Sequence, residues 1–377
     1  MRILLYGAGK SGTTAVFYAY KNTMPDVETS FEPDEFSKLN ILDTPNLLVK
    51  SLTVMKHARD AQYFCHFDRK ILIIRHPFDR LVSYVLYAPN NGHGFYNDAK
   101  MESYVNLLKS KLASPASVSF REIMERANSY GPNSGGTHAP VNALTEIAEA
   151  HPDFHVLRYE DFVDGKLDEL NRYNGFEVPS DPDISDQRQK VLRSKAYGDW
   201  HKWLLPEDVE YFRNVYRNYL DRFGYDTTLR SSEPLDEATT VAYSIKVNNH
   251  ARRTRWLPEF RPGSVALLEE GEHFQEARRA LLNGKLDQAE EMVDKLLAVN
   301  PGVAGFHHLR SRIMRKKGEY ARASEALRHA IAILPEEFEF HRLLSQALRK
   351  TGNKTEAAAA AAKARTLEGS AKKRRAM

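Results

Sequence analysis

The pattern of hydrophobic and polar positions divides the chain into two regions with different periodicities. Up to about residue 226, short strand-like runs alternate with longer stretches of helical character. The strand-like runs cover residues 2–6, 27–31, 46–50, 70–74 and 154–158. Strands that alternate with helices form a parallel sheet covered on both faces, and ligands bind at the carboxyl ends of its strands. We therefore predict an α/β fold for this region.

Helical stretches and long loops complete the first region. The predicted helices cover residues 15–20, 53–64, 79–87, 100–112, 119–128 and 206–223. The last of them begins with a proline and is followed by Gly224, an asymmetry typical of helix ends. Two polar, turn-rich segments, 88–99 and 129–140, are predicted as loops. Long loops at strand ends commonly hold a substrate site or a lid, which we expect here.

From residue 263 the sequence repeats with a period of 34 residues. Glycines recur at positions 284, 318 and 352, alanines at 289, 323 and 357, and prolines at 301 and 335. A helix–turn–helix unit of this length, with glycine at its turn, resembles the tetratricopeptide repeat (TPR). The resemblance implies an all-α module whose stacked helix pairs share one core.

These patterns predict four segments. They are an α/β domain over residues 1–228, a linker over 229–262, TPR-like helical repeats over 263–369 and a basic tail over 370–377. The third repeat has an alanine-rich second helix, and no complete capping helix follows it. Because an uncapped repeat array leaves an apolar end, we expect the repeats to contact a protein partner or to self-associate.

Composition narrows the class of protein further. Hydrophobic residues make up 42% and charged residues 28% of the 377 residues, as in an ordinary globular protein. The net charge of +4 suits an anionic ligand without requiring nucleic acid. The single cysteine, Cys65, excludes an intramolecular disulfide and a cysteine metal cage. Neither a signal peptide nor an apolar run of membrane-spanning length is evident, so we expect a cytoplasmic protein.

The first fourteen residues, MRILLYGAGKSGTT, have the pattern of an anion-binding strand, loop and helix. Glycines at positions 7, 9 and 12 allow a tight turn and a close approach of the backbone to a ligand. Thr13 and Thr14 then open a helix. The first N–H groups of that helix and the charge of Lys10 would hold a phosphate or sulfate.

The loop differs from that of Mg²⁺-dependent nucleotide-binding proteins, G-x-x-x-x-G-K-[ST]. The glycine that should precede Gly9 by five positions is Leu4 here. The strand 70–74 is followed by Arg75, where an NTPase would place a metal-binding aspartate. These departures favour a metal-free site that neutralises phosphate with side chains, and a P-loop kinase or NTPase is the alternative.

The stretches GAGKSGTT (7–14) and RHPFDRLVSY (75–84) resemble the two cofactor loops of sulfotransferases that use 3′-phosphoadenosine 5′-phosphosulfate (PAPS). The resemblance covers about residues 1–226 and implies a parallel-sheet, P-loop-like sulfotransferase domain. It implies that Lys10 stabilises the charge on the leaving phosphate and that Arg75 and Ser83 bind the 3′-phosphate. It assigns the 5′-phosphosulfate to Gly9, Lys10, Ser11, Gly12, Thr13 and Thr14.

Two later elements resemble the same family. Tyr159, in the sequence YED, matches a residue that family members place near the adenine. Arg193, Lys195 and Gly198 fall in a stretch similar to the loop R-K-G-x-x-G-D-W, which closes over the 3′-phosphate. The chain departs from that loop because Ser194 and Lys195 stand where Lys and Gly are usual.

Sulfuryl transfer to a hydroxyl also needs a general base. Sulfotransferases of phenols and steroids use the histidine of K-T-H, but this chain has Leu52 at that position. Sulfotransferases of the heparan type use the glutamate of E-P-x-x-F, which residues 32–36 resemble. The resemblance implies Glu32 as the base and Lys50 as its charge partner. His138, in a sequence slightly similar to the H-W-x-P-Q element of carbohydrate sulfotransferases, is the acceptor-side alternative.

The sequence therefore predicts a sulfotransferase that moves the sulfuryl group of PAPS to a hydroxyl of a carbohydrate or glycoconjugate. The expected product of the cofactor is 3′,5′-adenosine bisphosphate, and the in-line displacement would use no metal. A different class of function also fits the sequence. In that hypothesis the protein is a scaffold, with partner-binding TPR-like repeats and a nucleotide-binding remnant as its α/β domain.

Overall fold

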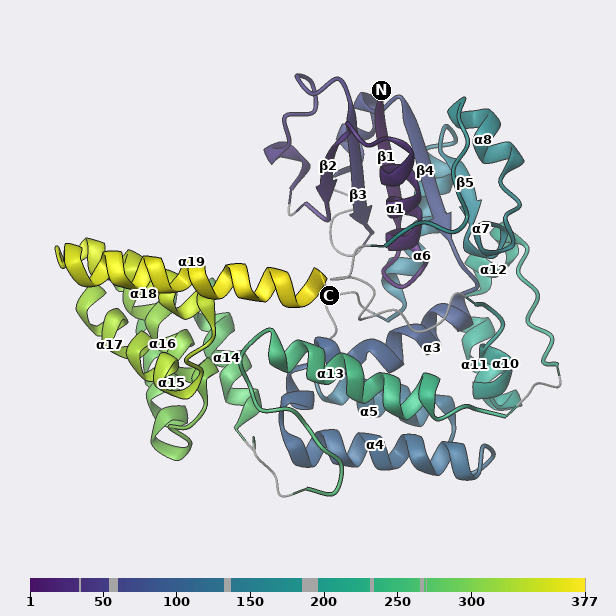
Figure 1. Ribbon diagram of the computed structural model, residues 1–377. Coiled ribbons are helices and arrows are strands. Elements are labelled where there is room, and N and C mark those ends of the chain that lie inside the picture. Colours follow the sequence, from purple (N-terminus) through teal and green to yellow (C-terminus); the bar gives the residue numbers. More distant parts are fainter. Residues whose placement is uncertain are drawn as a thin grey trace. The chain divides into compact units, whose positions relative to one another are not determined.

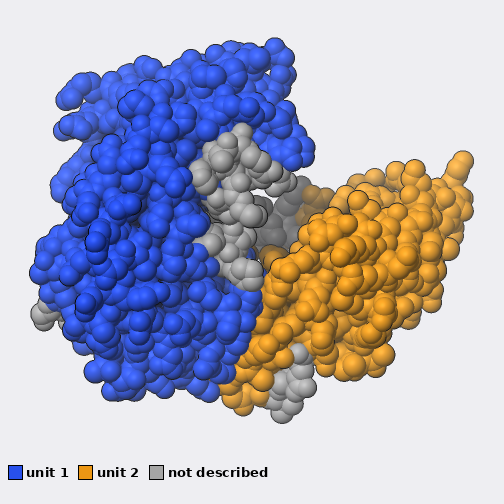
Figure 2. Space-filling model, turned by 180° about the vertical axis from the view of Figure 1, so that it is seen from behind, with its two compact units in different colours: residues 1–92, 103–247 blue, residues 93–102, 248–377 orange. Residues whose placement is uncertain are grey.

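The computed structural model describes residues 1–33, 35–53, 60–131, 137–184, 196–230, 234–264, 268 and 270–376, and Figure 1 labels their elements. The chain divides into two compact units, which Figure 2 shows in blue and orange. The first unit comprises residues 1–92 and 103–247, and the second comprises residues 93–102 and 248–377.

The described strands of the first unit form a five-stranded sheet in the order β2-β3-β1-β4-β5, with every neighbouring pair parallel. They are β1 (Arg2–Gly7), β2 (Glu28–Phe31), β3 (Leu47–Leu52), β4 (Arg69–Ile74) and β5 (His155–Arg158). All five predicted strands are present, each to within two residues at either end. The predicted α/β fold with a parallel sheet is thereby confirmed.

Alternate residues of each strand point to opposite faces of the sheet. Helices and loops cover both of these faces. On one face, Ile3 and Leu5 share a core with the apolar side of α1 (Thr13–Thr23). On the other face, the Tyr6 ring lies 5.2 Å from the Phe64 ring, centroid to centroid. Burial on both faces explains why β1 and β4 read as nearly continuous apolar runs.

Two of the helices predicted for the first unit differ from the prediction. The predicted helix 53–64 ends in a 3₁₀-helix (Ala61–His66), and its residues 54–59 lie outside the described residues. The predicted helix 206–223 is divided at the buried Tyr216. The other helices are α3 (Pro77–Tyr87), α5 (Phe120–Ser129), α6 (Ala139–Ala150), α7 (Tyr159–Asp164), α8 (Asp168–Asn174), α10 (Trp200–Trp203), α11 (Pro206–Val215) and α12 (Arg217–Phe223). Of these, α6, α7, α8 and α10 were not predicted.

The second unit contains the predicted helical repeats. Each helix packs on the next one along the chain, and the short turns at Gly284, Gly318 and Gly352 have φ values of 75°, 81° and 81°. Glycine adopts this left-handed conformation without steric cost, which accounts for its recurrence. The helices are α14 (Gly271–Leu282), α15 (Leu286–Val299), α16 (Ala304–Lys317), α17 (Tyr320–Ile333), α18 (Phe338–Lys350) and α19 (Lys354–Ala376). The all-α repeat module is thereby confirmed, and the predicted basic tail continues α19.

Residues 93–102, which precede the repeats by about 170 positions, belong to the second unit. Phe95 and Tyr96 are fully buried, and the Tyr96 ring joins the repeat core. The backbone of Tyr96 passes so close to Gly271 that a Cβ there would lie 1.9 Å from the Tyr96 carbonyl oxygen. Segment 88–99, predicted as a loop, therefore contains two 3₁₀-helices (Ala88–Asn90 and His93–Tyr96), and its Tyr96 packs in the core of the second unit.

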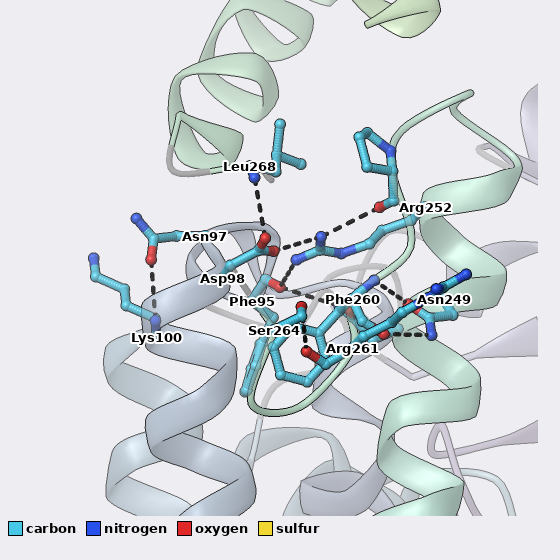
Figure 3. Close-up of polar contacts among 12 residues, drawn as sticks. Phe95, Asn97, Asp98, Lys100, Asn249, Arg252, Phe260, Arg261, Ser264 and Leu268 are labelled. Carbon is cyan, nitrogen blue, oxygen red and sulfur yellow. Dashed lines mark hydrogen bonds and ion pairs between the residues drawn. The ribbon is translucent and has the colours of Figure 1, made fainter. Parts of the chain in front are cut away.

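A buried ion pair anchors the same segment (Figure 3). Asp98 opens α4 (Asp98–Ala113), and its carboxylate lies 2.7 Å from the Arg252 guanidinium of α13 (Tyr243–Arg253). The other carboxylate oxygen accepts a hydrogen bond from the Leu268 N–H at 3.0 Å. Arg252 also donates to the Phe95 carbonyl at 3.1 Å. The hydrogen bonds of the buried guanidinium to described residues thus all go to acceptors, the Asp98 carboxylate and the Phe95 and Pro258 carbonyls.

The segment predicted as a linker, 229–262, is structured where the structure describes it. It contains α13, and the boundary between the two units falls within that helix, after Val247. Ser244, Val247 and Ala251 are buried, so α13 packs along its length. Among the described residues, no helix combines the length and the apolar character needed to cross a membrane.

Candidate functional site

The phosphate-loop candidate lies at the carboxyl end of β1. The connections to β2 and β3 run to one side of this strand, and those to β4 and β5 run to the other. Ligand sites in open α/β sheets form where the strand order changes direction in this way. The loop of residues 8–12 then enters α1, whose first residues are Thr13 and Thr14. The sheet topology therefore puts the predicted anion-binding loop at the expected edge.

The loop has an unusual backbone. Lys10 has φ 70° and Gly12 has φ 83°, so both are left-handed, and Ser11 between them is 2% exposed. The Ser11 N–H donates to the Ala8 carbonyl at 3.2 Å, which closes the turn. A left-handed lysine costs on the order of 1 kcal/mol or more, and such strain concentrates at functional sites. Lys10 also places its ammonium 3.7 Å from the centroid of the Tyr87 ring.

Tyr159 connects this loop to the second motif. A Cβ built on Gly12 would lie 2.1 Å from Cδ2 of Tyr159, so the ring packs directly against the glycine. The Arg75 guanidinium lies over the same ring, 4.5 Å from its centroid. The structure therefore brings the predicted residues Gly12, Arg75 and Tyr159 together. Because the Tyr159 ring lies so close, only glycine fits at position 12.

Arg75 follows the end of β4 and points toward the loop. Its guanidinium donates to the Lys10 carbonyl at 3.2 Å and to the Ala196 carbonyl at 3.1 Å. The Tyr219 hydroxyl donates to the Arg75 carbonyl at 3.0 Å and holds the backbone in place. Nε of Arg75 is buried without a hydrogen-bond partner, and no described carboxylate forms an ion pair with this side chain. A buried cation with an unused donor fits an anionic group such as a phosphate.

Arg80 and Asp79 have positioning roles that the sequence did not reveal. Arg80 is fully buried, and it donates to the Gly9 carbonyl at 2.9 Å and to the Thr137 carbonyl. Asp79 accepts from the N–H groups of Gly198 at 2.6 Å and Trp200 at 3.1 Å. The sequence carried one sign of these roles, two adjacent charged residues inside the otherwise apolar helix α3. Buried charges need partners, so such a pair indicates contacts with other segments.

Glu32 and Lys50 meet as the sequence predicted. Phe31 of β2 pairs with Lys50 of β3, and Glu32 follows directly. The Lys50 ammonium contacts the Glu32 carboxylate and lies 4.1 Å from the Phe31 ring centroid. The Lys50 side chain is 2% exposed and that of Glu32 is 41% exposed. A carboxylate held at one end by a buried cation and open to solvent at the other could accept a proton from a substrate hydroxyl.

His138 lies at the start of α6, on the same edge of the sheet. The hydroxyl of Thr53, which follows β3, donates to the Pro140 carbonyl at 2.8 Å. The His138 Nδ1 lies 2.7 Å from the Tyr216 hydroxyl oxygen. Burial and the nearby Arg80 charge lower the pKa of His138 to about 4, so the imidazole is neutral at pH 7.

The shifted pKa of His138 predicts an acid-sensitive contribution to stability. Between about pH 6.5 and about pH 4 the unfolded chain binds a proton that the folded imidazole does not, so stability is lost as the pH falls. The thermal unfolding midpoint of His138→Gln should therefore fall less than that of the unsubstituted protein over this range. Above pH 7 the two midpoints should differ by a constant amount. Parallel curves from pH 7 to pH 4 would contradict the shift.

The other predicted residues are placed as follows. Ser83 lies on α3, one turn after Arg80, and is 9% exposed. Gly198 is held by Asp79 with φ 86°. Arg193 and Lys195 lie outside the described residues. Among the described residues, no group of three or more His, Cys, Asp or Glu side chains is placed to hold a metal ion.

Comparison with known proteins assigns no family to the chain. No protein-family model and no curated protein matches it. Among solved structures, a crystal structure of MamA protein matches with a TM-score of 0.26 and 16% sequence identity, over 56% of this chain and 95% of that chain.

Proposed function

We propose that the protein is a PAPS-dependent sulfotransferase. The observation that carries the proposal is the junction of the two motifs. Arg75, from the end of β4, donates to the carbonyl of Lys10 in the phosphate loop, and Tyr159 packs against both motifs. A nucleotide that carries phosphate groups at both its 5′ and 3′ positions would need two such cationic motifs side by side.

The residues present fit this cofactor. Lys10 to Thr14 would hold the 5′-phosphosulfate through loop N–H groups and the start of α1. Arg75 and Ser83 would hold the 3′-phosphate, together with Arg193, Lys195 and Gly198 of the late loop. PAPS supplies the sulfuryl group when it is bound. Lys10 would stabilise negative charge on the phosphate that leaves.

The acceptor in this proposal is a hydroxyl of a carbohydrate or glycoconjugate. Glu32 would take the proton of that hydroxyl, and Lys50 would hold the carboxylate in position. The contact between the two side chains and the solvent-exposed part of Glu32 support these roles. His138 would be the acceptor-side alternative, and its neutral imidazole beside the Arg80 charge supports that role.

Adenosine bisphosphate should bind the protein without divalent metal, and EDTA should leave its affinity unchanged. Arg75→Ala should weaken this binding by about 2 kcal/mol, or roughly 30-fold, because a charge-assisted phosphate contact is lost. Isothermal titration calorimetry measures both effects.

Arg69→Ala is the matched control, since Arg69 begins the same strand and Arg75 follows its other end. This control should retain the affinity of the unsubstituted protein for adenosine bisphosphate. Preferential binding of ATP with Mg²⁺ would favour the kinase or NTPase alternative. Absence of binding to either nucleotide would favour the scaffold hypothesis.

A further inference from the structure

His138 forms a polar cluster with Tyr216 and Arg80 in the first unit. Tyr216 and Arg80 are fully buried, and His138 is partly exposed. Tyr216 lies at the break between α11 and α12, a position that neither proline nor glycine explains. Arg80 donates to the Gly9 carbonyl of the phosphate loop, so the cluster is connected directly to that loop.

Hydrogen bonds join the members of this cluster. The hydroxyl oxygen of Tyr216 lies 2.7 Å from Nδ1 of His138 and 3.4 Å from the carbonyl oxygen of Thr137. The same carbonyl accepts a hydrogen bond from Arg80, whose guanidinium is also hydrogen-bonded to the Tyr216 hydroxyl. Nε2 of His138 has no hydrogen-bond partner among the described residues. Because the His138 side chain is partly exposed, this nitrogen can reach a ligand.

The hydrogen bond at Nδ1 decides which nitrogen of the neutral imidazole carries the proton. If Tyr216 donates to Nδ1, the proton lies on Nε2. If Nδ1 donates to Tyr216, the tyrosine must donate to the Thr137 carbonyl instead. That contact, at 3.4 Å, exceeds the normal O–H···O range of about 2.5–3.0 Å, and the carbonyl already accepts from Arg80. Tyr216 is therefore the donor in the 2.7 Å bond, and Nε2 carries the proton.

The surrounding charge favours the same arrangement. The Arg80 guanidinium polarises the Tyr216 hydroxyl toward donation, because it holds the hydroxyl oxygen as an acceptor. His138 also directly precedes the first turn of α6, whose positive end disfavours a second proton on the imidazole. A base at Nε2 would have to become positively charged at this place. A neutral imidazole at a helix N-terminus is instead suited to donate a hydrogen bond.

We propose that Tyr216 fixes His138 as the Nε2–H tautomer and that His138 donates this hydrogen bond to an oxygen of the acceptor substrate. The ligand is a hydroxyl, ring or ether oxygen of the carbohydrate, next to the hydroxyl that reacts. His138 is thus an acceptor-binding residue, Tyr216 is a positioning residue, and Glu32 takes the proton. The identity of the ligand rests on the proposed function, whereas the tautomer does not depend on it.

Nuclear magnetic resonance of the full chain labelled with ¹⁵N-histidine tests the tautomer without any substrate. His138→Gln identifies the His138 signals among those of the 14 histidines, because only they disappear. At pH 7 we expect a protonated Nε2 and an unprotonated Nδ1. In Tyr216→Phe, which keeps the buried ring and loses the hydroxyl, the signals should shift toward a mixture of the two tautomers. An Nδ1–H tautomer in the unsubstituted protein would overturn the proposal.

Tyr104→Phe is the matched control for Tyr216→Phe. Tyr104 is also fully buried, and its hydroxyl donates to the Val85 carbonyl at 2.9 Å. This control should leave the His138 signals unchanged. Equal shifts in both variants would rule out a positioning role for Tyr216, because the effect would then follow the loss of any buried hydroxyl.

Acceptor kinetics test the role of the donor, with PAPS and the best substrate from a panel of p-nitrophenyl glycosides. Tyr216→Phe should raise KM for the glycoside severalfold and leave kcat within about twofold of the unsubstituted value, since a binding contact is weakened. A lower kcat at constant KM would contradict the donor role. The double variant Tyr216→Phe/His138→Gln should match the KM of His138→Gln, because the glutamine amide offers an N–H without help from Tyr216.

The two measurements separate this inference from the proposed function. Absence of turnover with every glycoside would count against the sulfotransferase, whereas an Nε2–H tautomer would still support His138 as a hydrogen-bond donor. Turnover combined with an Nδ1–H tautomer would leave the sulfotransferase in place and refute the donor.

Discussion

Replacing Glu32 by glutamine is expected to lower turnover about 100-fold or more, while the affinity for adenosine bisphosphate stays nearly unchanged. Glutamine keeps the shape of the side chain and can still accept a hydrogen bond from Lys50, but it cannot take a proton from an acceptor hydroxyl. The phosphate loop, Arg75 and Tyr159 are not altered. Turnover is measured as release of adenosine bisphosphate from PAPS with the best acceptor from a panel of hydroxyl compounds.

Loss of the carboxylate also affects Lys50, whose side chain is 2% exposed. The thermal midpoint of Glu32→Gln should therefore fall, because the buried ammonium keeps its charge and loses its anionic partner. Turnover must be compared well below that midpoint. The affinity for adenosine bisphosphate separates a folding defect from a chemical one, because a partly unfolded protein would also lose this affinity.

Two variants serve as comparisons for Glu32→Gln. Glu35→Gln changes a neighbouring glutamate that pairs with Lys38 at the surface, and it should leave turnover unchanged. His138→Ala should alter acceptor binding more than the chemical step. If Glu32→Gln keeps normal turnover and His138→Ala abolishes it, the roles of the two residues are reversed.

Replacing Asp98 by alanine should destabilise the second unit by about 3–5 kcal/mol. The Arg252 guanidinium is fully buried, and Asp98 is its ion-pair partner at 2.7 Å (Figure 3). Removal of the carboxylate leaves this positive charge uncompensated and removes the acceptor for the Leu268 N–H. Chemical denaturation followed by helix circular dichroism measures the loss.

Glu259→Ala is the matched control, because Glu259 pairs with Arg253, the residue after Arg252. Both side chains of that pair are substantially exposed, so its removal should cost about 1 kcal/mol or less. The double variant Asp98→Leu/Arg252→Met should recover part of the stability, since it removes both buried charges. Similar losses for Asp98→Ala and Glu259→Ala would show that the buried pair does not anchor segment 93–102.

Local patterns in the sequence determined most of the elements. The apolar runs at 2–6 and 70–74 predicted β1 and β4 because a parallel strand buried on both faces has no polar side. The 34-residue period predicted the helix pairs of the repeats because the left-handed turns between them favour glycine at one fixed position. The pairing of Glu32 with Lys50 was implied by the resemblance of residues 32–36 to the E-P-x-x-F motif.

Only the tertiary structure decided which distant segments meet. Residues 93–99 belong to a segment predicted as a polar loop, yet they are part of the second unit, because Tyr96 packs in its core and Asp98 pairs with Arg252, which is 154 positions away. In the same way, Arg80 joins the phosphate loop to Thr137 by donating to two backbone carbonyls. Every residue has a backbone carbonyl, so the sequence does not indicate which ones are the acceptors. The sequence records which residues are apolar or charged, but burial and charge compensation between remote residues arise only when the chain is folded.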